Sequence, residues 1–424
     1  MQLRPDSQRV VITGMGAISP LGHSVDEYWD GLIHGRSGIA KITRFDASDY
    51  PTQIAGEVKD FDITKWISVK EARRMGRASQ LAIATAYETL QDAGLQLPLP
   101  EAEQEEVGVL IGTAMGNFEK AVDDLQTFYK KGWRLSSPFG ITGALPNMPA
   151  HHVSMIAQAK GPISTVVNAC ATGTHAIGEA ADYIRRGAAR IMICGGVEGI
   201  ICDYGIGGFN VMRALSTRNA DPEHASRPFD KDRDGFILGE GCGLLVLESL
   251  ESARARHAKI YAEVLGHASS SDAYHVAAPD PTGSGAIRAM KWAIRDAQIE
   301  PNEVNYINAH GTSTPINDAV ETMAIKKFFG EQAYNIAISS TKSMIGHCMG
   351  AAGSLEAIAC TKIIQQGLIH PTMNYETPDP ECDLDYVPNS PRPADIRIAM
   401  SNSFGLGGNN ACLVVGKYFN GTGH

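Results

Sequence analysis

One cysteine and two histidines stand where side-chain chemistry is expected. Cys170 lies in VVNACATGTHAIGEA, between a β-branched run and a helical pattern of small residues. His310 follows a strand-like run in NYINAHGTSTP, and His347 stands in a Gly-rich loop, STKSMIGHCMGAAG. Free N–H groups at a helix N-terminus favour a thiolate, and imidazole side chains exchange protons near neutral pH. The three residues are therefore candidates for a nucleophile with two acid–base partners.

Each of the three also has a purely structural interpretation. The chain contains 8 cysteines without a CxxC pair or disulfide-like spacing, and most lie in apolar runs, as reduced and buried thiols do. A lone histidine is more often a hydrogen-bonded structural residue than a catalytic one, and we interpret His175 in this way. The junction of strand and helix favours catalysis by Cys170, but these residues alone leave both interpretations open.

Three further motifs resemble binding sequences but are incomplete. GMGAIS contains part of a dinucleotide fingerprint, but Pro20 follows it and no acidic ribose partner is evident. GFILGEGCG lacks the lysine of a phosphate-binding loop. DKDRDGF lacks the ligand spacing of a calcium loop, and we interpret it as a solvated charged loop. Because no ligand set has zinc spacing either, we expect no required cofactor.

The elements that must position these residues alternate between strands and helices. The strand-like runs are RVVITGMG, VGVLIGT, ISTVVNA, ARIMICGG, GLLVLE, KIYAEVLG, VNYINAH, NIAISST, IRIAMSNS and ACLVVG. Helical patterns span residues 24–34, 77–94, 171–186, 283–298, 317–329 and 353–366. This alternation predicts an α/β fold with mostly buried sheets.

A faint internal repeat relates two parts of the chain. CATGTHAIGEAADYIRRG, residues 170–187, aligns without a gap with GAAGSLEAIACTKIIQQG, residues 350–367. Both segments are small or apolar on nearly all sides, so both helices should be buried. The repeat favours two similar halves, residues 1–255 and 256–424, with one central helix in each, although one short match can also arise by chance.

The ordered motifs resemble those of elongating β-ketoacyl-[acyl-carrier-protein] synthases of the thiolase superfamily, of the bacterial synthase II type. NACATGTHAIG, NAHGTSTP, STKSMIGHCMGAAG and NSFGLGGNNA stand in the family order, and the resemblance extends over nearly the whole chain. It implies a thiolase-like five-layer αβαβα fold of two similar halves, and a homodimer. The implied reaction is the decarboxylating condensation of an acyl group on Cys170 with malonyl-acyl-carrier protein in fatty-acid elongation.

The resemblance also implies roles for individual residues. Cys170 attacks the acyl thioester, and His310 and His347 donate hydrogen bonds to the malonyl thioester oxygen as it becomes an enolate. The remaining implied residues are an orienting charged pair, Lys342 and Glu321; hydroxyls for the pantetheine arm, Thr312 and Thr314; a gating ring, Phe404; oxyanion-hole N–H groups, at Cys170 and Leu406; and a structural monovalent-cation site, Asn308, Glu356, Ser401 and Asn402.

The sequence departs from the family pattern at two places. Leu406 stands where many relatives have a second phenylalanine, which changes the pocket but not the backbone donor. TPIND replaces the usual small-residue–Gly–Asp stretch, so we expect a different loop before Asp318.

The charge balance restricts the partners. A formal net charge of −10 disfavours generic binding to nucleic acid or to anionic membranes. Acyl carrier proteins are themselves acidic, and VKEARRMGR offers Lys70, Arg73 and Arg74 as a local basic patch, with Arg213 added by the resemblance. A solvated helix face accounts for the three charges of the patch equally well. No apolar run has the length of a membrane span, and only a few polar residues precede RVVITG, so we expect a cytoplasmic protein without a signal or transit peptide.

Three alternatives to the elongating enzyme stay open on the sequence. A chain-length-factor-like partner subunit of the same fold would lack the nucleophile, against which Cys170 argues. A degradative thiolase would need a second active cysteine in the C-terminal Gly-rich motif, which here reads NSFGLGGNNA. A ketosynthase of a polyketide or specialised lipid pathway would share the chemistry.

Overall fold

One sheet of ten strands organises the fold, and its two halves repeat the same strand order. The structure, a computed structural model, describes residues 4–419. The sheet order is β10-β9-β13-β14-β8-β1-β7-β6-β4-β5. The strands are β1 (Val10–Ile18), β4 (Val107–Gly112), β5 (Ile163–Ser164), β6 (Ile191–Glu198), β7 (Gly241–Ser249), β8 (Ala262–Ser271), β9 (Tyr306–Asn308), β10 (Ala337–Ser339), β13 (Ile398–Gly405) and β14 (Asn409–Gly416).

The two halves of the sheet meet at β1 and β8, which pair only through Val10, Val11 and Ile12. Outward from this junction the order is β1-β7-β6-β4-β5 on one side and β8-β14-β13-β9-β10 on the other. The first two pairings on each side are antiparallel and the last two are parallel. The predicted two similar halves are therefore confirmed in strand order and direction, whereas the boundary at residue 255 stays a prediction.

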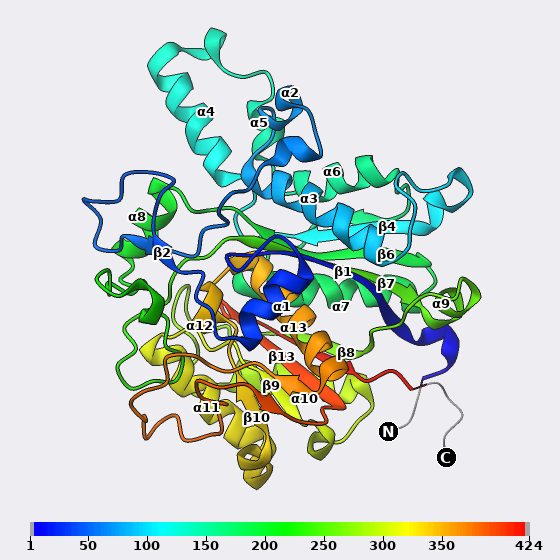
Figure 1. The fold of residues 1–424 in the computed structure, drawn as a ribbon, viewed down its shortest axis with the longest axis vertical. Helices are drawn as coiled ribbons and strands as arrows, with labels where there is room; N and C mark the ends of the chain where they lie inside the picture. Colours follow the sequence, from blue (N-terminus) through cyan, green and yellow to red (C-terminus); the bar gives the residue numbers. More distant parts are fainter. Residues whose placement is uncertain (1–3, 420–424) are drawn as a thin grey trace.

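Helices form three layers around the two half-sheets (Figure 1). Two central helices, α7 (Thr172–Arg185) and α13 (Ala352–Gln366), lie between the half-sheets, as the five-layer prediction requires. The outer layers contain α3 (Arg77–Asp92) and α6 (Met148–Ala157) on one side, and α10 (Ser284–Ala297) and α11 (Pro315–Phe329) on the other. The other elements are α1 (Val25–Ile33), α2 (Val69–Ala72), α4 (Phe118–Lys131), α5 (Gly140–Ala144), α8 (Asp203–Val211), α9 (Leu250–Ala255), α12 (Lys342–Ile345), and the short strands β2 (Ala40–Lys41), β3 (Ile54–Ala55), β11 (Leu368–Ile369) and β12 (Arg392–Pro393).

The central helices cross in backbone contact because glycines stand at the crossing. A Cβ atom on Gly173 would lie 2.7 Å from the Ser354 nitrogen, and one on Gly353 would lie 2.1 Å from the Thr174 hydroxyl. These two glycines occupy matching positions of the internal repeat. The glycines of the repeat therefore have a steric reason: each central helix needs a residue without a side chain where the backbone of the other helix crosses it.

The six predicted helices are all present, but the sequence analysis missed the other helices, of which α4, α6 and α8 are the longest. Helix α4 has no buried residue and projects from the top of the molecule (Figure 1), so its apolar residues do not mark a core. The run ISTVVNA is a strand only at its first two residues, because β5 pairs with β4 only there. Among the described residues, no helix has both the length and the apolar character needed to cross a bilayer.

The interpretation of DKDRDGF as a solvated charged loop holds for Lys231, Asp232 and Asp234, which are exposed, but is wrong for Asp230 and Arg233. Asp230 is fully buried and accepts hydrogen bonds from the N–H groups of Glu376 and Thr377 at 2.7 and 2.6 Å. Arg233 is also buried and donates to the Thr314 carbonyl at 3.1 Å. These two charges are internal because they tie the loop that leads into α11 to the rest of the fold.

Candidate active site

Cys170 lies in the 3₁₀ turn Ala169–Ala171 that begins α7. The turn requires Ala169 to adopt a φ of 48°, a left-handed conformation that non-glycine residues rarely take. The cysteine is 5% exposed and points into the interior of the molecule, not onto its surface. Strain at this position indicates that the surrounding structure fixes the turn, as expected for a functional site.

The thiol is protonated at neutral pH in this structure. Burial raises the pKa of Cys170 to about 11, although the Leu406 N–H, the Lys342 charge and the cysteine's own N–H all lower it. The N–H groups at the helix start favour the thiolate, as the sequence predicts, but they do not determine the net direction of the pKa shift. Desolvation of the charged form outweighs the stabilising groups at the helix terminus.

The two histidines lie beside the thiol, as the sequence predicts. Cys170, His310 and His347 are all buried, and their sulfur and ring nitrogen atoms lie within 4.8 Å of one another. The two imidazole rings stand edge to face with centroids 5.3 Å apart. Burial, the Lys342 charge and, for His310, the neighbouring His347 hold both pKa values well below the usual range, so both rings are neutral.

A backbone hydrogen bond fixes the tautomer of His347. The Met349 N–H donates to Nδ1 at 3.3 Å, so Nδ1 is an acceptor and Nε2 carries the proton. Among the described residues, Nε2 is buried and has no hydrogen-bond partner. The ring therefore offers a donor to a ligand, and this state opposes metal binding through Nε2 because a metal needs the lone pair.

Glu321 and Lys342 both lie close to the histidines, but they do not form the predicted pair. Lys342, the first residue of α12, forms a buried ion pair with Glu356 of α13. Glu321 instead accepts hydrogen bonds from the N–H groups of His310 and Gly311, each at 2.8 Å. Burial raises the pKa of Glu321 to about 7 against these donors. The pairing of Lys342 with Glu321 is wrong because the packing of α12 on α13 brings a different carboxylate to the ammonium group.

The predicted substrate-binding residues lie around the same centre. The hydroxyls of Thr312 and Thr314 are 3.0 Å apart, and Thr314 also caps α11. The half-buried ring of Phe404 stands 5.7 Å from that of His310, centroid to centroid. The Leu406 N–H faces the thiol from the loop between β13 and β14.

Three of the four predicted cation ligands carry buried oxygen atoms that lack a partner among the described residues. These atoms are Asn308 Oδ1, Glu356 Oε2 and Ser401 Oγ. Asn308 and Ser401 are neighbours on the parallel strands β9 and β13. Asn402 differs, because its Oδ1 accepts from Cys412 at 3.3 Å. Unsatisfied buried oxygens are costly, so the first three residues fit a monovalent cation that takes oxygen ligands.

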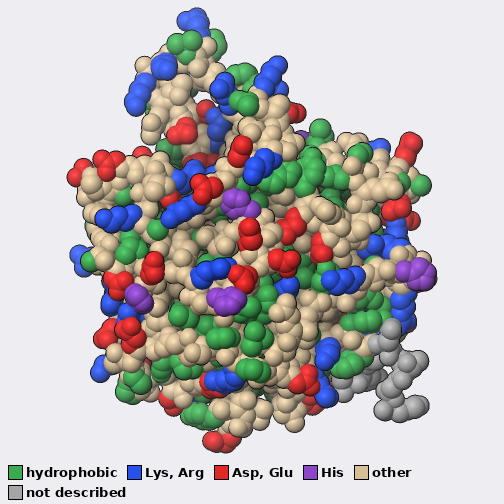
Figure 2. Space-filling model, viewed as in Figure 1, with side chains coloured by type: hydrophobic (Ala, Val, Ile, Leu, Met, Phe, Trp, Pro, Cys, Tyr) green, Lys and Arg blue, Asp and Glu red, His purple; other side chains and the backbone are tan. Residues whose placement is uncertain are grey.

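The predicted basic patch is on the surface beside the projecting segment. Lys70 and Arg73 are exposed on and after α2, and the Arg74 guanidinium lies 4.4 Å above the Phe139 ring at the start of α5. Figure 2 shows further Lys and Arg side chains on the projecting segment at the top. Arg213 is exposed after α8, which lies lower in Figure 1 than α2.

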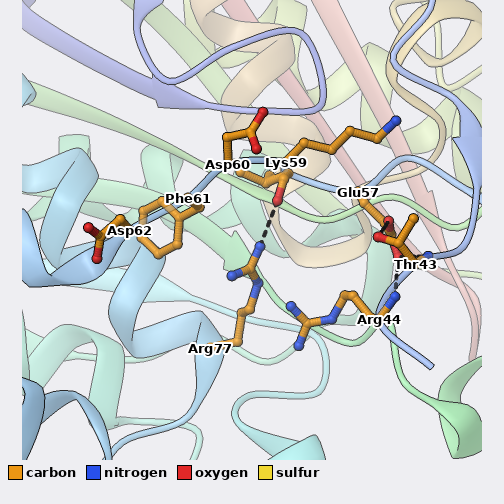
Figure 3. Close-up of a pocket in the computed structure, with 9 residues that line it drawn as sticks. Thr43, Arg44, Glu57, Lys59, Asp60, Phe61, Asp62 and Arg77 are labelled. Atoms are coloured by element: carbon orange, nitrogen blue, oxygen red, sulfur yellow. Dashed lines mark hydrogen bonds between the residues drawn. The ribbon is translucent and has the colours of Figure 1, made fainter.

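A separate cavity of about 590 Å³ opens near β3, away from the thiol (Figure 3). Its walls carry both signs of charge, and Arg77 is already paired with Glu240 at 2.8 Å. The Glu57 carboxylate accepts hydrogen bonds from the Thr43 hydroxyl and N–H, at 2.7 and 2.9 Å. Because these two charged side chains are already bound within the protein, we assign no ligand to this cavity.

Sequence reasoning missed one buried acid at the candidate active site. Glu198 ends β6 with no exposure to solvent, and its charge raises the pKa of Cys170. The available signal was a single acidic residue at the end of the apolar run ARIMICGGVE.

Comparisons with known proteins identify relatives over nearly the whole chain. Residues 7–253 match the family model described as "Beta-ketoacyl synthase, N-terminal domain", and residues 261–376 match "Beta-ketoacyl synthase, C-terminal domain". The "3-oxoacyl-[acyl-carrier-protein] synthase 2" of Synechocystis sp. is 51% identical over 414 residues, which cover 97% of this chain and 99% of the relative.

Solved structures match over the same length. "The ishigamide ketosynthase/chain length factor" is 40% identical with a TM-score of 0.90, covering 97% of this chain and 99% of the other. A type II polyketide ketosynthase in complex with its acyl-carrier protein is 35% identical with a TM-score of 0.89, again covering 97% and 99%. At these identities the likeness extends beyond the fold to the sequence.

Proposed function

The chain belongs to the beta-ketoacyl synthase family, and from that premise we propose that Cys170 carries the acyl group while His310 and His347 stabilise the enolate in chain elongation. The observation that carries this assignment is the buried cluster in which the thiol and two neutral imidazoles lie within 4.8 Å of one another.

The enzyme is an acyltransferase that condenses an acyl group with malonyl-acyl-carrier protein in fatty-acid elongation. The acyl group first moves from its carrier protein to the enzyme, with release of the free carrier thiol. Malonyl-carrier protein then loses carbon dioxide, and the resulting enolate carbon attacks the enzyme-bound thioester. A carbon–carbon bond forms, the enzyme thiolate leaves and takes up a proton, and 3-oxoacyl-carrier protein is the product.

Acyl loading begins at the start of α7. The pKa of about 11 means that Cys170 must lose its proton during attack, and the Leu406 N–H and the Lys342 charge stabilise the thiolate as it forms. The same N–H, with that of Cys170, serves as an oxyanion hole for the tetrahedral intermediate. These donors are already oriented toward the sulfur, so little reorganisation is needed.

Decarboxylation takes place in front of the two histidines. A neutral imidazole that keeps its proton on Nε2 donates a hydrogen bond to the thioester oxygen, and that bond strengthens as the oxygen acquires charge. The Met349 N–H holds His347 in the required tautomer. Glu321 orients the backbone of His310 by accepting a hydrogen bond from its N–H, and burial, assisted by the Lys342 charge, keeps both rings neutral.

Phe404 acts as a gate between the two steps. Its ring lies against His310, and the loop that follows contains Gly405, Gly407 and Gly408, which restrict the backbone little. Acylation moves the ring aside and admits malonyl-carrier protein. Phe404→Ala should therefore slow extension of a loaded enzyme about tenfold while loading changes less, and equal losses in both steps would contradict the gate.

A monovalent cation, when bound, supplies positive charge to Asn308, Glu356 and Ser401. The role of the cation is structural. Glu356 also forms the ion pair with Lys342, so the cation site is connected to the ammonium group beside the histidines. No chemical step passes through it.

The carrier protein is the partner, and the basic patch of Lys70, Arg73, Arg74 and Arg213 receives its acidic surface. The enzyme acts as a homodimer in the cytoplasm. Support for the dimer comes from β5, an edge strand whose neighbourhood exposes Ile163 and Val167 by 52% and 51% of their surface. Such an edge is normally covered, and a second copy of the chain can pair with it.

Purified enzyme should convert acyl- and malonyl-carrier protein to 3-oxoacyl-carrier protein with one carbon dioxide released per condensation. Product is measured by mass spectrometry of the carrier, and omission of either carrier substrate is the control. If the carrier returned unextended from a complete reaction, the assignment would be wrong. Carrier proteins loaded with graded chain lengths would also separate fatty-acid from polyketide substrates.

A further inference from the structure

Glu198 places a carboxylate beside the active site that the proposed reaction does not use. The residue ends β6, its side chain is fully buried, and its charge raises the pKa of the Cys170 thiol. A buried acid next to a nucleophile opposes thiolate formation, so its presence needs a compensating role.

The carboxylate is surrounded by donors from two segments. Oε2 accepts from the N–H groups of Ala114 and Gly350 at 2.9 and 3.1 Å. Oε1 accepts from the Thr113 hydroxyl at 3.3 Å and from the Met115 N–H at 3.4 Å. Residues 113–115 follow β4 in the first half of the chain, and Gly350 lies in the 3₁₀ turn that precedes α13 in the second. Glu198 therefore joins the two halves at the active site.

The contact with Gly350 leads directly to a catalytic histidine. Gly350 is the middle residue of the 3₁₀ turn Met349–Ala351, whose first N–H fixes the tautomer of His347. The turn is closely packed against residues 113–115, because a Cβ atom on Gly350 would lie 2.5 Å from the Ala114 nitrogen. If the carboxylate releases Gly350, the adjacent Met349 N–H moves with the turn.

We propose that Glu198 is a positioning residue for malonyl decarboxylation, because its carboxylate holds the turn Met349–Ala351 against residues 113–115 and so keeps the His347 ring in its donor state. This inference rests on the proposed function. It assigns Glu198 to the second half-reaction alone, since its described hydrogen bonds reach the turn before α13 and not the turn that carries Cys170.

The charge of Glu198 predicts an opposite effect on the first half-reaction. Burial raises the pKa of Glu198 itself to about 7, so its carboxylate is largely charged only above neutral pH. In that range, loss of this charge lowers the pKa of Cys170, whose other neighbours, the Leu406 N–H and Lys342, already favour the thiolate. A variant that only loosens the fold would slow both half-reactions. A variant that removes a positioning carboxylate should slow decarboxylation and accelerate the reactions of the thiol.

The test is Glu198→Gln, which keeps the shape and removes the charge and one acceptor. Carbon dioxide release from malonyl-carrier protein should fall about tenfold, while alkylation of Cys170 by iodoacetamide at about pH 8.5, where Glu198 is ionised in the wild type, should rise severalfold and acyl loading should be retained. The matched control is Glu88→Gln, since Glu88 is a half-buried carboxylate that likewise accepts from two backbone N–H groups, those of Ala17 and Val25, at 2.9 and 2.8 Å. It should change neither half-reaction.

Equal losses in both half-reactions of Glu198→Gln, or no loss of decarboxylation, would overturn the proposal, as would the same split in Glu88→Gln. If Glu198→Gln does not fold, Thr113→Val removes one donor at nearly constant volume and should give a smaller loss of decarboxylation alone. Unchanged decarboxylation in that variant would also overturn the proposal. If the wild-type enzyme showed no condensation, the proposed function would be refuted. The comparisons between variants test only the role of Glu198.

Discussion

The turns that begin the two central helices have the same backbone conformation. Ala169 and Met349, the first residues of the two 3₁₀ turns, have φ angles of 48° and 45°. The helix caps Ala171 and Ala351 have φ angles of −81° and −84°. The second half of the chain thus reproduces the local geometry that presents the nucleophile in the first half.

The two turns differ in what faces their N–H groups. In the first turn the middle residue is Cys170, whose thiol and the nearby Leu406 N–H face the reaction space. In the second turn the middle residue is Gly350, whose N–H is bound by the carboxylate of Glu198. A helix start that can hold an anion is therefore left for substrate in one half and filled by the protein's own side chain in the other. The comparison shows that the backbone conformation shared by the two turns does not by itself create an active site. The side chains and N–H groups that surround the turn decide its role.

The substitution Cys170→Gly places a glycine in the middle of the first turn, as in the second turn. Condensation should fall at least about 1000-fold because no acyl acceptor remains, while the fold persists because the Gly350 turn shows that this backbone accepts glycine. Activity is measured as 3-oxoacyl product and folding by circular dichroism. The control is Cys202→Ser, a half-buried cysteine that should retain activity. Condensation by Cys170→Gly near the wild-type rate would show that the first turn does not differ from the second by carrying the nucleophile.

His310→Ala and His347→Ala test the side of the site next to the second turn. Each should slow carbon dioxide release about 100-fold or more, because each removes a donor to the enolate oxygen, and acyl loading should change far less. The two rates are measured separately, with malonyl- and acyl-carrier protein. Equal losses in loading would assign a histidine as the base of the thiol instead.

Gly350→Ala tests whether the second turn is as closely packed as the distances indicate. The added Cβ would lie 2.5 Å from the Ala114 nitrogen, so the variant should lose about 1–3 kcal/mol of unfolding free energy. Gly208→Ala is the control, since that position in α8 has open space around it and should not be destabilised. The measurement is denaturant unfolding. Equal stabilities of the two variants would show that the second turn can relax.

The pH dependence of thiol reactivity tests the first turn without a mutation. With a Cys170 pKa of about 11, the thiolate fraction rises with pH over the range below this value. Alkylation of Cys170 should accelerate about 100-fold between pH 7 and pH 9. Peptide mapping keeps the signal of this cysteine apart from the others. A rate already constant above pH 7 would mean that the helix start stabilises the thiolate more than burial opposes it.

Charge reversal at Lys70, Arg73 and Arg74 should leave both turns unchanged and affect only delivery. The KM for carrier substrates should rise severalfold and lose part of its salt dependence, because the patch attracts an acidic partner from a distance. Turnover with a small acyl thioester without carrier protein is the control and should be retained. A matching loss with the small substrate would place the effect at the active site.

The sequence predicted the elements whose burial is visible in the pattern of their own residues. The matching glycines at positions 173 and 353 identified both central helices because close helix packing admits only small residues there. Helix α4 could not be predicted in the same way, since its apolar residues Leu125 and Phe128 are exposed rather than buried.

The site was predicted as far as local motifs reach. Cys170, His310 and His347 lie together as expected, because each ends a local pattern of strand and loop. The partner of Lys342 and the direction of the Cys170 pKa shift could not be predicted, since both depend on the packing of distant segments. Glu198 was missed for the same reason: its donors come from residues 113–115 and 350, far away in the sequence.

The most direct test of the account is the location of the acyl group after the first half-reaction. The enzyme is incubated with acyl-carrier protein alone, digested and mapped by mass spectrometry. The account predicts one acyl adduct, on the peptide that contains Cys170, and its loss when malonyl-carrier protein is added. An adduct on any of the other cysteines, such as the more accessible Cys202, with Cys170 unmodified, would contradict it.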